Sequence, residues 1–205
     1  MDRGLFEGYG VGKIKEVRPV KLIVGMIAGR EELFELSQTE LSSKFGMIDY
    51  ESEILPFVHT DYYEKEMGKH LKRRFVSFQK PFDPEKLAEI KLFTNQLEEK
   101  FSLQDNRQIN LDPGYLSLSK LVLATTKDYS HRIYLREGIY AEVTLYYQDK
   151  TFKPYPWTYP DYKTKDYQEV FSQIRQIYLE QLRVKGSGLY FLLRRHDKES
   201  GKFYS

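Results

Sequence analysis

The chain has 205 residues, of which 40% are hydrophobic and 30% charged, which is typical of one globular domain and excludes a disordered or fibrous chain. Its 32 basic and 30 acidic residues leave a formal charge of +2, so no overall field attracts nucleic acid or an anionic membrane. The absence of cysteine excludes disulfides, thiolate metal sites and a cysteine nucleophile. No apolar run of about 18 residues and no export signal occurs, so we expect a cytoplasmic protein without a membrane span.

The first part of the chain begins with a strand and a helix. Residues 20–29 are almost continuously apolar, which predicts a central strand covered on both faces. Acidic residues followed by apolar residues at helical spacing predict a helix over residues 30–45, which Gly46 ends. Alternating patterns predict two further strands over residues 47–57 and 73–80.

A second helix and a fourth strand complete this unit. The helix is predicted over residues 83–101, with Asp83 as N-cap and Pro84 at the first helical position. Residues 107–117 predict a strand broken by a turn at Asp112-Pro113-Gly114. The order β-α-β-β-α-β is that of a ferredoxin-like unit.

A β-hairpin is predicted to extend the unit. A two-residue loop would mix polar and apolar residues on both faces, whereas a three-residue loop, Arg136-Glu137-Gly138 with Gly138 at positive φ, separates them. The pairs expected from this register are Leu135–Ile139, Ile133–Ala141, His131–Val143, Tyr134–Tyr140 and Arg132–Glu142. The last pair places opposite charges directly across from one another.

Residues 154–162, PYPWTYPDY, contain three prolines and the only tryptophan, Trp157. Because proline holds the preceding residue in an extended conformation, we interpret this segment as a stiff strap between the hairpin and a final helix. The alternative is an aromatic wall that binds a ligand. The final helix is predicted to begin after the N-cap Thr164 and to end at Gly186.

The predicted fold is therefore α+β, a ferredoxin-like βαββαβ unit extended by a β-hairpin and a C-terminal helix. We expect an N-terminal extension over residues 1–19, a single domain over residues 20–185, and a tail over residues 186–205 that could form a small hairpin.

No complete phosphate-binding loop, metal site or nucleophile motif occurs. The cluster EGYGVGKI lacks the first Walker glycine and the Mg²⁺-binding Ser/Thr, and GMIAGREE has Arg-Glu where Lys-Ser/Thr is required. The four histidines have no short metal-ligand spacing, and G-x-S-x-G is absent. The sequence thus predicts no metal site and identifies no cofactor.

Two segments carry polar residues that need an explanation. On the second long helix, Lys91, Asn95 and Glu98 share one edge; they either form a simple ion pair at that edge or line a cleft. Residues 59–74 are either a solvated connecting helix with Thr60 as N-cap or a flap over a ligand. In the second case Arg73 and Arg74 at its end neutralise a phosphate.

Six stretches occur together and in order: HTDYYEKEMG, IKLFTNQLE, NLDPGYL, LVLATTKDYSHRIYL, GIYAEVTL and PWTYPDY. With them the chain resembles an uncharacterised bacterial family, domain-of-unknown-function family 4416, over about residues 20–182. The resemblance implies little chemistry. Some members carry the label "GTP-binding protein", which the incomplete Walker motifs do not support.

We expect a small polar or phosphorylated ligand in a cleft between the βαββαβ unit and the added hairpin. The candidate ligand-binding residues are Tyr62, Tyr63, Glu66, Arg73, Lys91, Asn95, Asp112, Arg132, Trp157 and Asp161, and the candidate acid/base residues are His131 and Glu142. One alternative is a nucleic-acid or protein interaction module that uses exposed tyrosines, with nucleic acid disfavoured by the charge balance. The other is an acid/base enzyme that acts on a phosphorylated metabolite.

Overall fold

The computed structural model describes residues 16–185. The strands are β1 (Lys21–Ala28), β2 (Ile48–Glu51), β3 (Leu55–Pro56), β4 (Lys72–Phe78), β5 (Ile109–Leu116), β6 (Lys120–Thr125), β7 (Ile133–Arg136), β8 (Ile139–Gln148) and β9 (Thr151–Pro154). The helices are α1 (Glu32–Phe45), α2 (Glu64–Met67), α3 (Leu87–Lys100) and α4 (Lys165–Lys185), with 3-10 turns η1 (Pro84–Lys86) and η2 (Asp161–Lys163).

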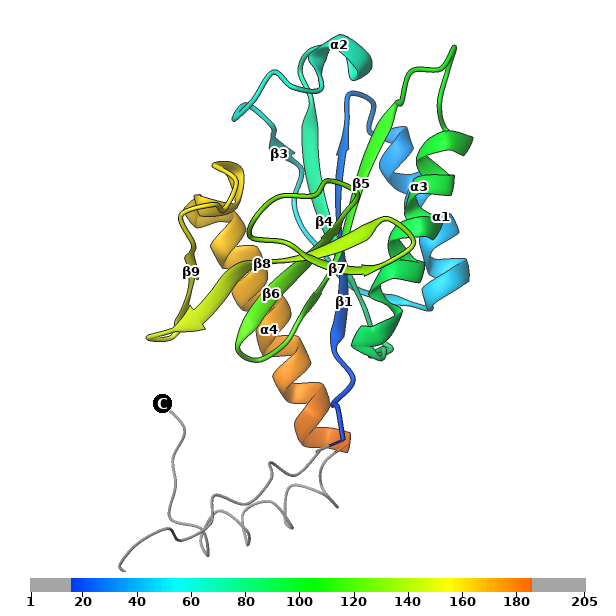
Figure 1. Cartoon of the computed structure of the whole chain (residues 1–205). Coiled ribbons are helices and arrows are strands. Elements are labelled where there is room, and N and C mark those ends of the chain that lie inside the picture. Colours follow the sequence, from blue (N-terminus) through cyan, green and yellow to red (C-terminus); the bar gives the residue numbers. More distant parts are fainter. Residues whose placement is uncertain (1–15, 186–205) are drawn as a thin grey trace, which may run out of the picture.

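One antiparallel sheet contains all nine of these strands. Its order is β2-β4-β1-β5-β6-β8-β7, with β3 also paired to β4 and β9 to β8. Helices α1 and α3 lie side by side against one face, and α4 crosses the other (Figure 1). The fold is thus mixed α+β, as predicted.

Strand β1 is the centre of this arrangement. It lies between β4 and β5, and all eight of its residues are buried. Leu22, Val24 and Met26 pack into the core beneath α1 and α3, whereas Ile23 packs into the core beneath α4. The alternation of side chains in a strand supplies both cores, so the predicted central strand is confirmed.

The predicted helix ends are largely confirmed. Helix α1 ends at Gly46, which has φ of 93° and donates its N–H to Ser42 O. Asp83 accepts a bond from the N–H of Glu85 but caps the turn η1, and α3 begins only at Leu87. Thr164 Oγ1 accepts the N–H of Tyr167, as expected of the N-cap of α4. Gly186 lies outside the described residues.

The predicted turn at Asp112-Pro113-Gly114 is wrong, because β5 continues to Leu116. Pro113 is tolerated there because β6 pairs with β5 only from Gly114 onward, which leaves one edge of the strand unpartnered at the proline.

The single strand predicted over residues 47–57 is wrong as well, since β2 and β3 are separate. Between them, Ser52 bonds Phe75 through its backbone N–H and its side chain, which interrupts the regular ladder.

The hairpin register is only partly as predicted. Ile133 pairs with Ala141 and Tyr134 with Tyr140, but Arg136, not Leu135, lies opposite Ile139. The loop consists of two residues, Glu137 and Gly138, which have φ of 53° and 74°, and the register shifts between Tyr134 and Arg136. Both positive φ angles suit a tight hairpin turn, and the irregularity absorbs the extra residue.

The predicted apolar face of the hairpin is also wrong on the side of β7. All four residues of that strand are exposed, and β7 begins at Ile133, so the expected pair of His131 with Val143 is not part of the ladder. Strand β7 is the edge of the sheet.

The remaining segments differ from expectation in extent. Helix α2 has only four residues and ends at Gly68, and Thr60 is not its N-cap but accepts the N–H of Tyr62 one turn earlier. Strands β6 and β9 were not predicted. No helix within residues 16–185 has the length and apolar character needed to cross a membrane. The possible terminal hairpin lies outside the described residues, as does most of the predicted N-terminal extension.

Candidate functional site

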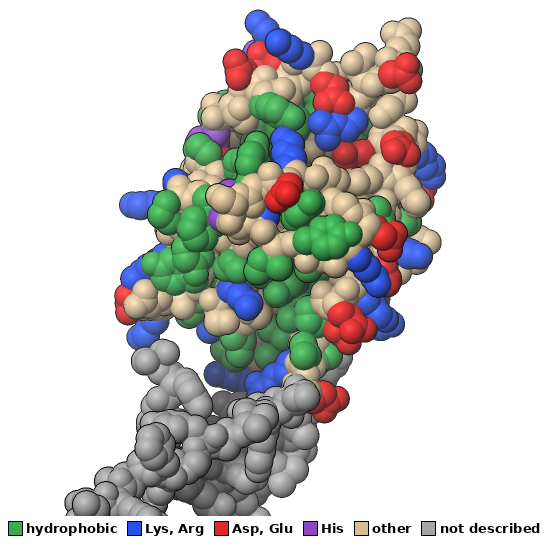
Figure 2. All heavy atoms as spheres, in the orientation of Figure 1, with side chains coloured by type: hydrophobic (Ala, Val, Ile, Leu, Met, Phe, Trp, Pro, Cys, Tyr) green, Lys and Arg blue, Asp and Glu red, His purple; other side chains and the backbone are tan. Residues whose placement is uncertain are grey.

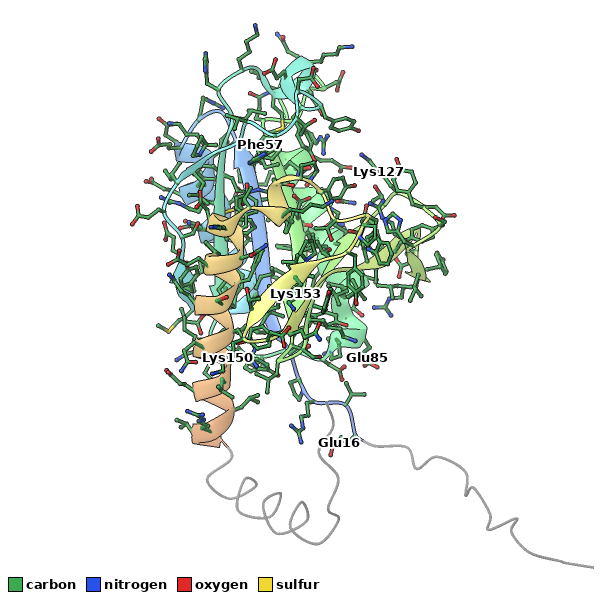
Figure 3. All side chains as sticks on the ribbon, turned by 90° about the vertical axis from the view of Figure 1, so that its left-hand side faces the viewer. Glu16, Phe57, Glu85, Lys127, Lys150 and Lys153 are labelled. Carbon is green, nitrogen blue, oxygen red and sulfur yellow. The ribbon has the colours of Figure 1, made fainter. Side chains whose placement is uncertain are left out.

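A cavity of about 700 Å³ is lined by residues from both halves of the domain. The first half runs from β1 to β5, and the added half runs from β6 to α4. The cavity wall comes from β1, the segment between β3 and α2, β4, α3, β5, β6, the loop before β7, β8 and η2. Two of its residues, Phe57 and Lys127, lie toward the end of the molecule opposite Glu16 (Figure 3). Nine of the predicted ligand-binding or acid/base residues line it: Tyr62, Tyr63, Arg73, Lys91, Asn95, Asp112, Arg132, Glu142 and Asp161.

Arg73 is one of the most buried charged groups of this wall, with 2% of its surface exposed. Its guanidinium donates to Asp112 Oδ2 and Asp161 Oδ2, each at 3.0 Å, and to the Tyr167 hydroxyl at 3.3 Å. These partners come from β5, η2 and α4, so one side chain of β4 ties the two halves together. Arg73 was predicted to neutralise a phosphate, but in the structure its guanidinium is already bonded to two protein carboxylates.

The polar edge of α3 faces the cavity and also contains the simple ion pair. Lys91 Nζ lies 3.7 Å from Glu98 Oε1 and donates to Leu111 O at 2.8 Å. Glu98 accepts the N–H of Leu111 at 2.7 Å and a bond from Arg107 at 3.2 Å. Glu66 does not line the cavity; it holds Arg107 through two bonds of 2.7 and 2.8 Å. The residues of this edge thus form an ion pair and also line the cavity, so the ion-pair and the cleft interpretations apply to the same side chains.

Arg132 and Glu142 form the predicted pair, buried to within 2% side-chain exposure each. Arg132 Nε donates to Glu142 Oε2 at 2.8 Å, and a second guanidinium nitrogen donates to the Tyr159 hydroxyl at 2.8 Å. His131 Nε2 lies 3.1 Å from the same carboxylate oxygen, but His131 is not part of the cavity wall. In this arrangement the carboxylate of Glu142 balances the positive charge of Arg132.

Trp157 lies outside the cavity, in a row of rings. It stacks on His131 at 5.4 Å and on Tyr155 at 4.7 Å, and His131 stacks in turn on Tyr129 at 6.0 Å. Its indole N–H donates to Val143 O. The strap therefore packs Trp157 against the hairpin, whereas Asp161 at its other end reaches the cavity and Arg73.

The environment shifts the pKa values of several groups of the wall, among them Glu98, Asp112 and Tyr63. Burial raises the pKa of Glu98, against the lowering effect of Lys91 and Arg107. Burial opposes ionisation of Asp112, but the charges of Arg73 and Lys91 outweigh it and lower its pKa. Burial, followed by the negative charge of Asp112, raises the pKa of the Tyr63 hydroxyl.

A comparison with protein-family models matches residues 18–178 to the family "Domain of unknown function (DUF4416)". The chain belongs to the DUF4416 family. No curated protein and no solved structure matches this DUF4416 protein. The matched range contains every residue of the cavity wall.

Several residues of the cavity in this DUF4416 protein were not among the candidates. They are Arg107, Lys127, Tyr129, Tyr159 and Tyr162. For Tyr159 a signal existed, because Pro160 holds it extended and so turns its side chain away from that of its neighbour. Arg107 and Lys127 lie in loops without any pattern that sequence periodicity can detect.

The DUF4416 cavity contains no arrangement typical of a metal centre. Among the described residues, no group of three or more His, Asp or Glu side chains could hold a metal ion. The wall contains hydrogen-bond donors and acceptors, aromatic ring faces, and charged side chains arranged in ion pairs. Two buried polar atoms of the wall, the Tyr162 hydroxyl and the Asn110 amide nitrogen, have no hydrogen-bond partner in the described chain.

Proposed function

We propose that this DUF4416 protein binds a small polar ligand in the cavity between its two halves. The observation that carries the proposal is the cavity itself, whose volume of about 700 Å³ is within the range of small-molecule sites. Its polar residues come from segments far apart in the sequence, and many are buried. Buried polar groups cost stability unless they are hydrogen-bonded or paired, so their concentration around one cavity is more typical of a binding site than of a core.

A phosphorylated ligand, which the sequence also suggested, is the less favoured form. Arg73, Arg107 and Arg132 each already bind at least one protein carboxylate. A phosphate would have to compete with these carboxylates for the same donors. On the face seen in Figure 2, basic and acidic side chains are interspersed, so this face has no large basic surface that would attract an anion.

The test is a thermal-shift screen of the purified protein with nucleotides, sugar phosphates, polyols and amines. A ligand at 100 times its dissociation constant adds about 2.7 kcal/mol to the free energy of unfolding. Asn95→Ala removes a half-buried amide of the wall that makes no hydrogen bond in the described chain, and Gln96→Ala is the matched control on the exposed side of the same helix. A true ligand raises the melting temperature of the wild type and of Gln96→Ala more than that of Asn95→Ala. A screen in which no compound distinguishes the two variants contradicts the proposal.

We also infer that β1, α1, β2, β4, α3 and β5 form a ferredoxin-like unit. The support is their antiparallel strand order, β2-β4-β1-β5, together with two helices on one face. The strands from β6 onward and helix α4 are then additions, and the cavity lies at their junction with the unit.

An interaction module remains the alternative, favoured by the exposed rings of Tyr62, Tyr129 and Tyr134. Each of these rings already contacts another aromatic ring: Tyr62 contacts Tyr63, Tyr134 contacts Tyr140, and Tyr129 stacks on His131. The faces of Tyr62 and Tyr129 also lie beneath the cations of Lys127 and Arg132, which leaves less ring surface for nucleic-acid bases. Binding to single-stranded RNA that weakens steeply with salt would support this alternative.

An acid/base enzyme is less favoured, because Glu142 already accepts bonds from Arg132 and lies beside His131.

A further inference from the structure

Several aromatic rings of the cavity make cation–π contacts with arginine or lysine side chains. The cation-to-ring distances are 5.5 Å for Arg73 over both Phe57 and Tyr162, 5.8 Å for Arg107 over Tyr63, 4.6 Å for Arg132 over Tyr129 and 4.3 Å for Lys127 over Tyr62. The ring quadrupole attracts a cation above its face, most strongly where water is excluded. Tyr159 is a ring of the wall that holds no cation over its face in the described chain; its hydroxyl, in contrast, accepts a bond from Arg132.

The charged side chains that line the cavity balance, with the cations Arg73, Lys91, Arg107, Lys127 and Arg132 and the carboxylates Glu98, Glu99, Asp112, Glu142 and Asp161. Around Arg73, however, two carboxylates, Asp112 and Asp161, share one guanidinium, which leaves a local excess of negative charge. Lys127 is exposed and donates to the Tyr62 hydroxyl at 3.1 Å instead of to a carboxylate. An uncompensated charge in a partly buried network is costly, and a ligand of the opposite sign would remove that cost.

The excess is centred on Asp112. It shares Arg73 with Asp161, and only its Oδ2 accepts a bond from that guanidinium. A quarter of its side chain (25%) is exposed, and it lines the cavity. Asp112, Tyr63 and Tyr159 all line this cavity.

We propose that the ligand of this cavity is a small organic cation, a primary amine or a quaternary ammonium compound. Its charge would be neutralised by Asp112 and covered by the rings of Tyr63 and Tyr159. This inference rests on the proposed function, because it names the class of ligand for the same cavity. The saturated arginines and the excess carboxylate favour a cation over an anion, and the rings favour an organic cation over a metal ion.

The experiment compares charged compounds with uncharged isosteres on the full chain. The probes are choline, its isostere with a tert-butyl group in place of trimethylammonium, ethanolamine, and ethylene glycol. Calorimetric titration measures each dissociation constant. We expect at least one cation to bind and its uncharged partner to bind at least about tenfold more weakly, the effect of losing one partly buried charge contact. Choline and ethanolamine together separate the quaternary from the primary amine.

Two variants locate the bound cation. Asp112→Asn removes the negative charge, and Tyr159→Leu removes the ring; each is expected to weaken cation binding, the second by about 2- to 30-fold. Glu85→Gln removes one negative charge at the opposite end of the molecule (Figure 3) and should leave binding unchanged. If Asp112→Asn does not fold, because Asp112 also holds Arg73, Tyr159→Leu still tests the ring and Tyr159→Phe controls for the hydroxyl.

Three results would overturn the inference: equal binding of cation and isostere, no binding of either cation, or cation binding that neither variant weakens. The proposed function fails separately. If the cations do not bind but a neutral or anionic compound distinguishes Asn95→Ala from Gln96→Ala, only the charge of the ligand is wrong. If no compound does so, both proposals are wrong.

Discussion

Arg73 shows how one buried charge can join the two halves of a domain. It lies on β4, and its carboxylate and hydroxyl partners come from β5, η2 and α4. Its guanidinium is also packed over the rings of Phe75 and Tyr167, at 5.1 and 5.7 Å. The group is desolvated but fully bonded, which is the condition under which a buried ion is tolerated.

We therefore expect Arg73→Leu to lower the free energy of unfolding by about 3–5 kcal/mol, since it leaves two carboxylates close together without their cation. Urea unfolding followed by circular dichroism measures this change. The control is Arg136→Leu, which removes an exposed ion pair with Glu89 and should cost less than about 1 kcal/mol. Equal effects of the two substitutions would show that the buried network contributes nothing beyond an ordinary surface pair.

Glu98 gives a prediction for pH. Burial raises its pKa in the folded chain above the ordinary value, so the folded state holds a proton that the unfolded state has already released. The stabilising effect of this proton is complete below the unfolded pKa and is lost as the pH rises through the folded pKa. Glu98→Gln should remove this loss, so that the variant gains stability relative to the wild type as the pH rises above the ordinary glutamate pKa of about 4.3.

The matched control is Glu99→Gln, which changes the same charge at an exposed position of the same helix. A comparison of the urea midpoints of the three proteins at each pH separates the effect of the buried Glu98 from that of an exposed carboxyl on the same helix. If Glu98→Gln and Glu99→Gln follow the same curve, the carboxyl of Glu98 is not destabilised by its surroundings.

At the scale of single elements, Gly114 decides how closely β5 and β6 approach. A Cβ atom added at this position would overlap the backbone oxygen of Val122 and come within 2.7 Å of the Leu123 side chain. Gly114→Ala is expected to cost about 1–3 kcal/mol, because backbone atoms in a paired strand cannot move away independently. In Gly29→Ala the new atom lies 3.5 Å from its nearest neighbour, an ordinary contact, so this variant should unfold at nearly the wild-type urea concentration. A small effect of Gly114→Ala would mean that β6 is loosely paired at this point.

The same glycine shows why some elements could not be predicted. Asp112-Pro113-Gly114 has the composition of a turn, but the proline meets an unpaired edge and the glycine a close neighbour, both of which depend on where β6 lies. Likewise, a shift of one residue near Leu135 depends on the geometry of the Glu137-Gly138 turn. In contrast, β1, α1 and α3 were predictable, because their apolar spacing alone determines which side is buried.

At the scale of the whole molecule, much of the cavity wall could be found from polar residues at positions where apolar ones are expected. Lys91 and Asn95 on α3 were recognised in this way, and Arg132 and Glu142 through their cross-strand pairing. The order of the sheet, together with the packing that brings β6 beside α3 and Lys127 to Tyr62, has no signal of this kind. Long-range pairings of strands are decided by packing that a local pattern does not contain.

The continuous sheet leads to a last prediction, that residues 16–185 unfold in one cooperative step. The core beneath α4 contains Ile23 of β1 and Phe75 of β4 together with Leu145, Phe152 and Phe171 of the added half. Neither half can lose its structure without exposing this shared core, so no intermediate should be populated.

Trp157, the only tryptophan, reports on the strap, where it stacks between His131 and Tyr155. Its fluorescence and the far-UV circular dichroism should therefore give the same urea midpoint. The double variant Trp157→Phe, Tyr50→Trp moves the reporter to β2, near the opposite edge of the sheet, and should give coincident transitions again. A strap signal that changes at lower urea than the β2 signal would show that the added half unfolds first and that the shared core does not couple the two.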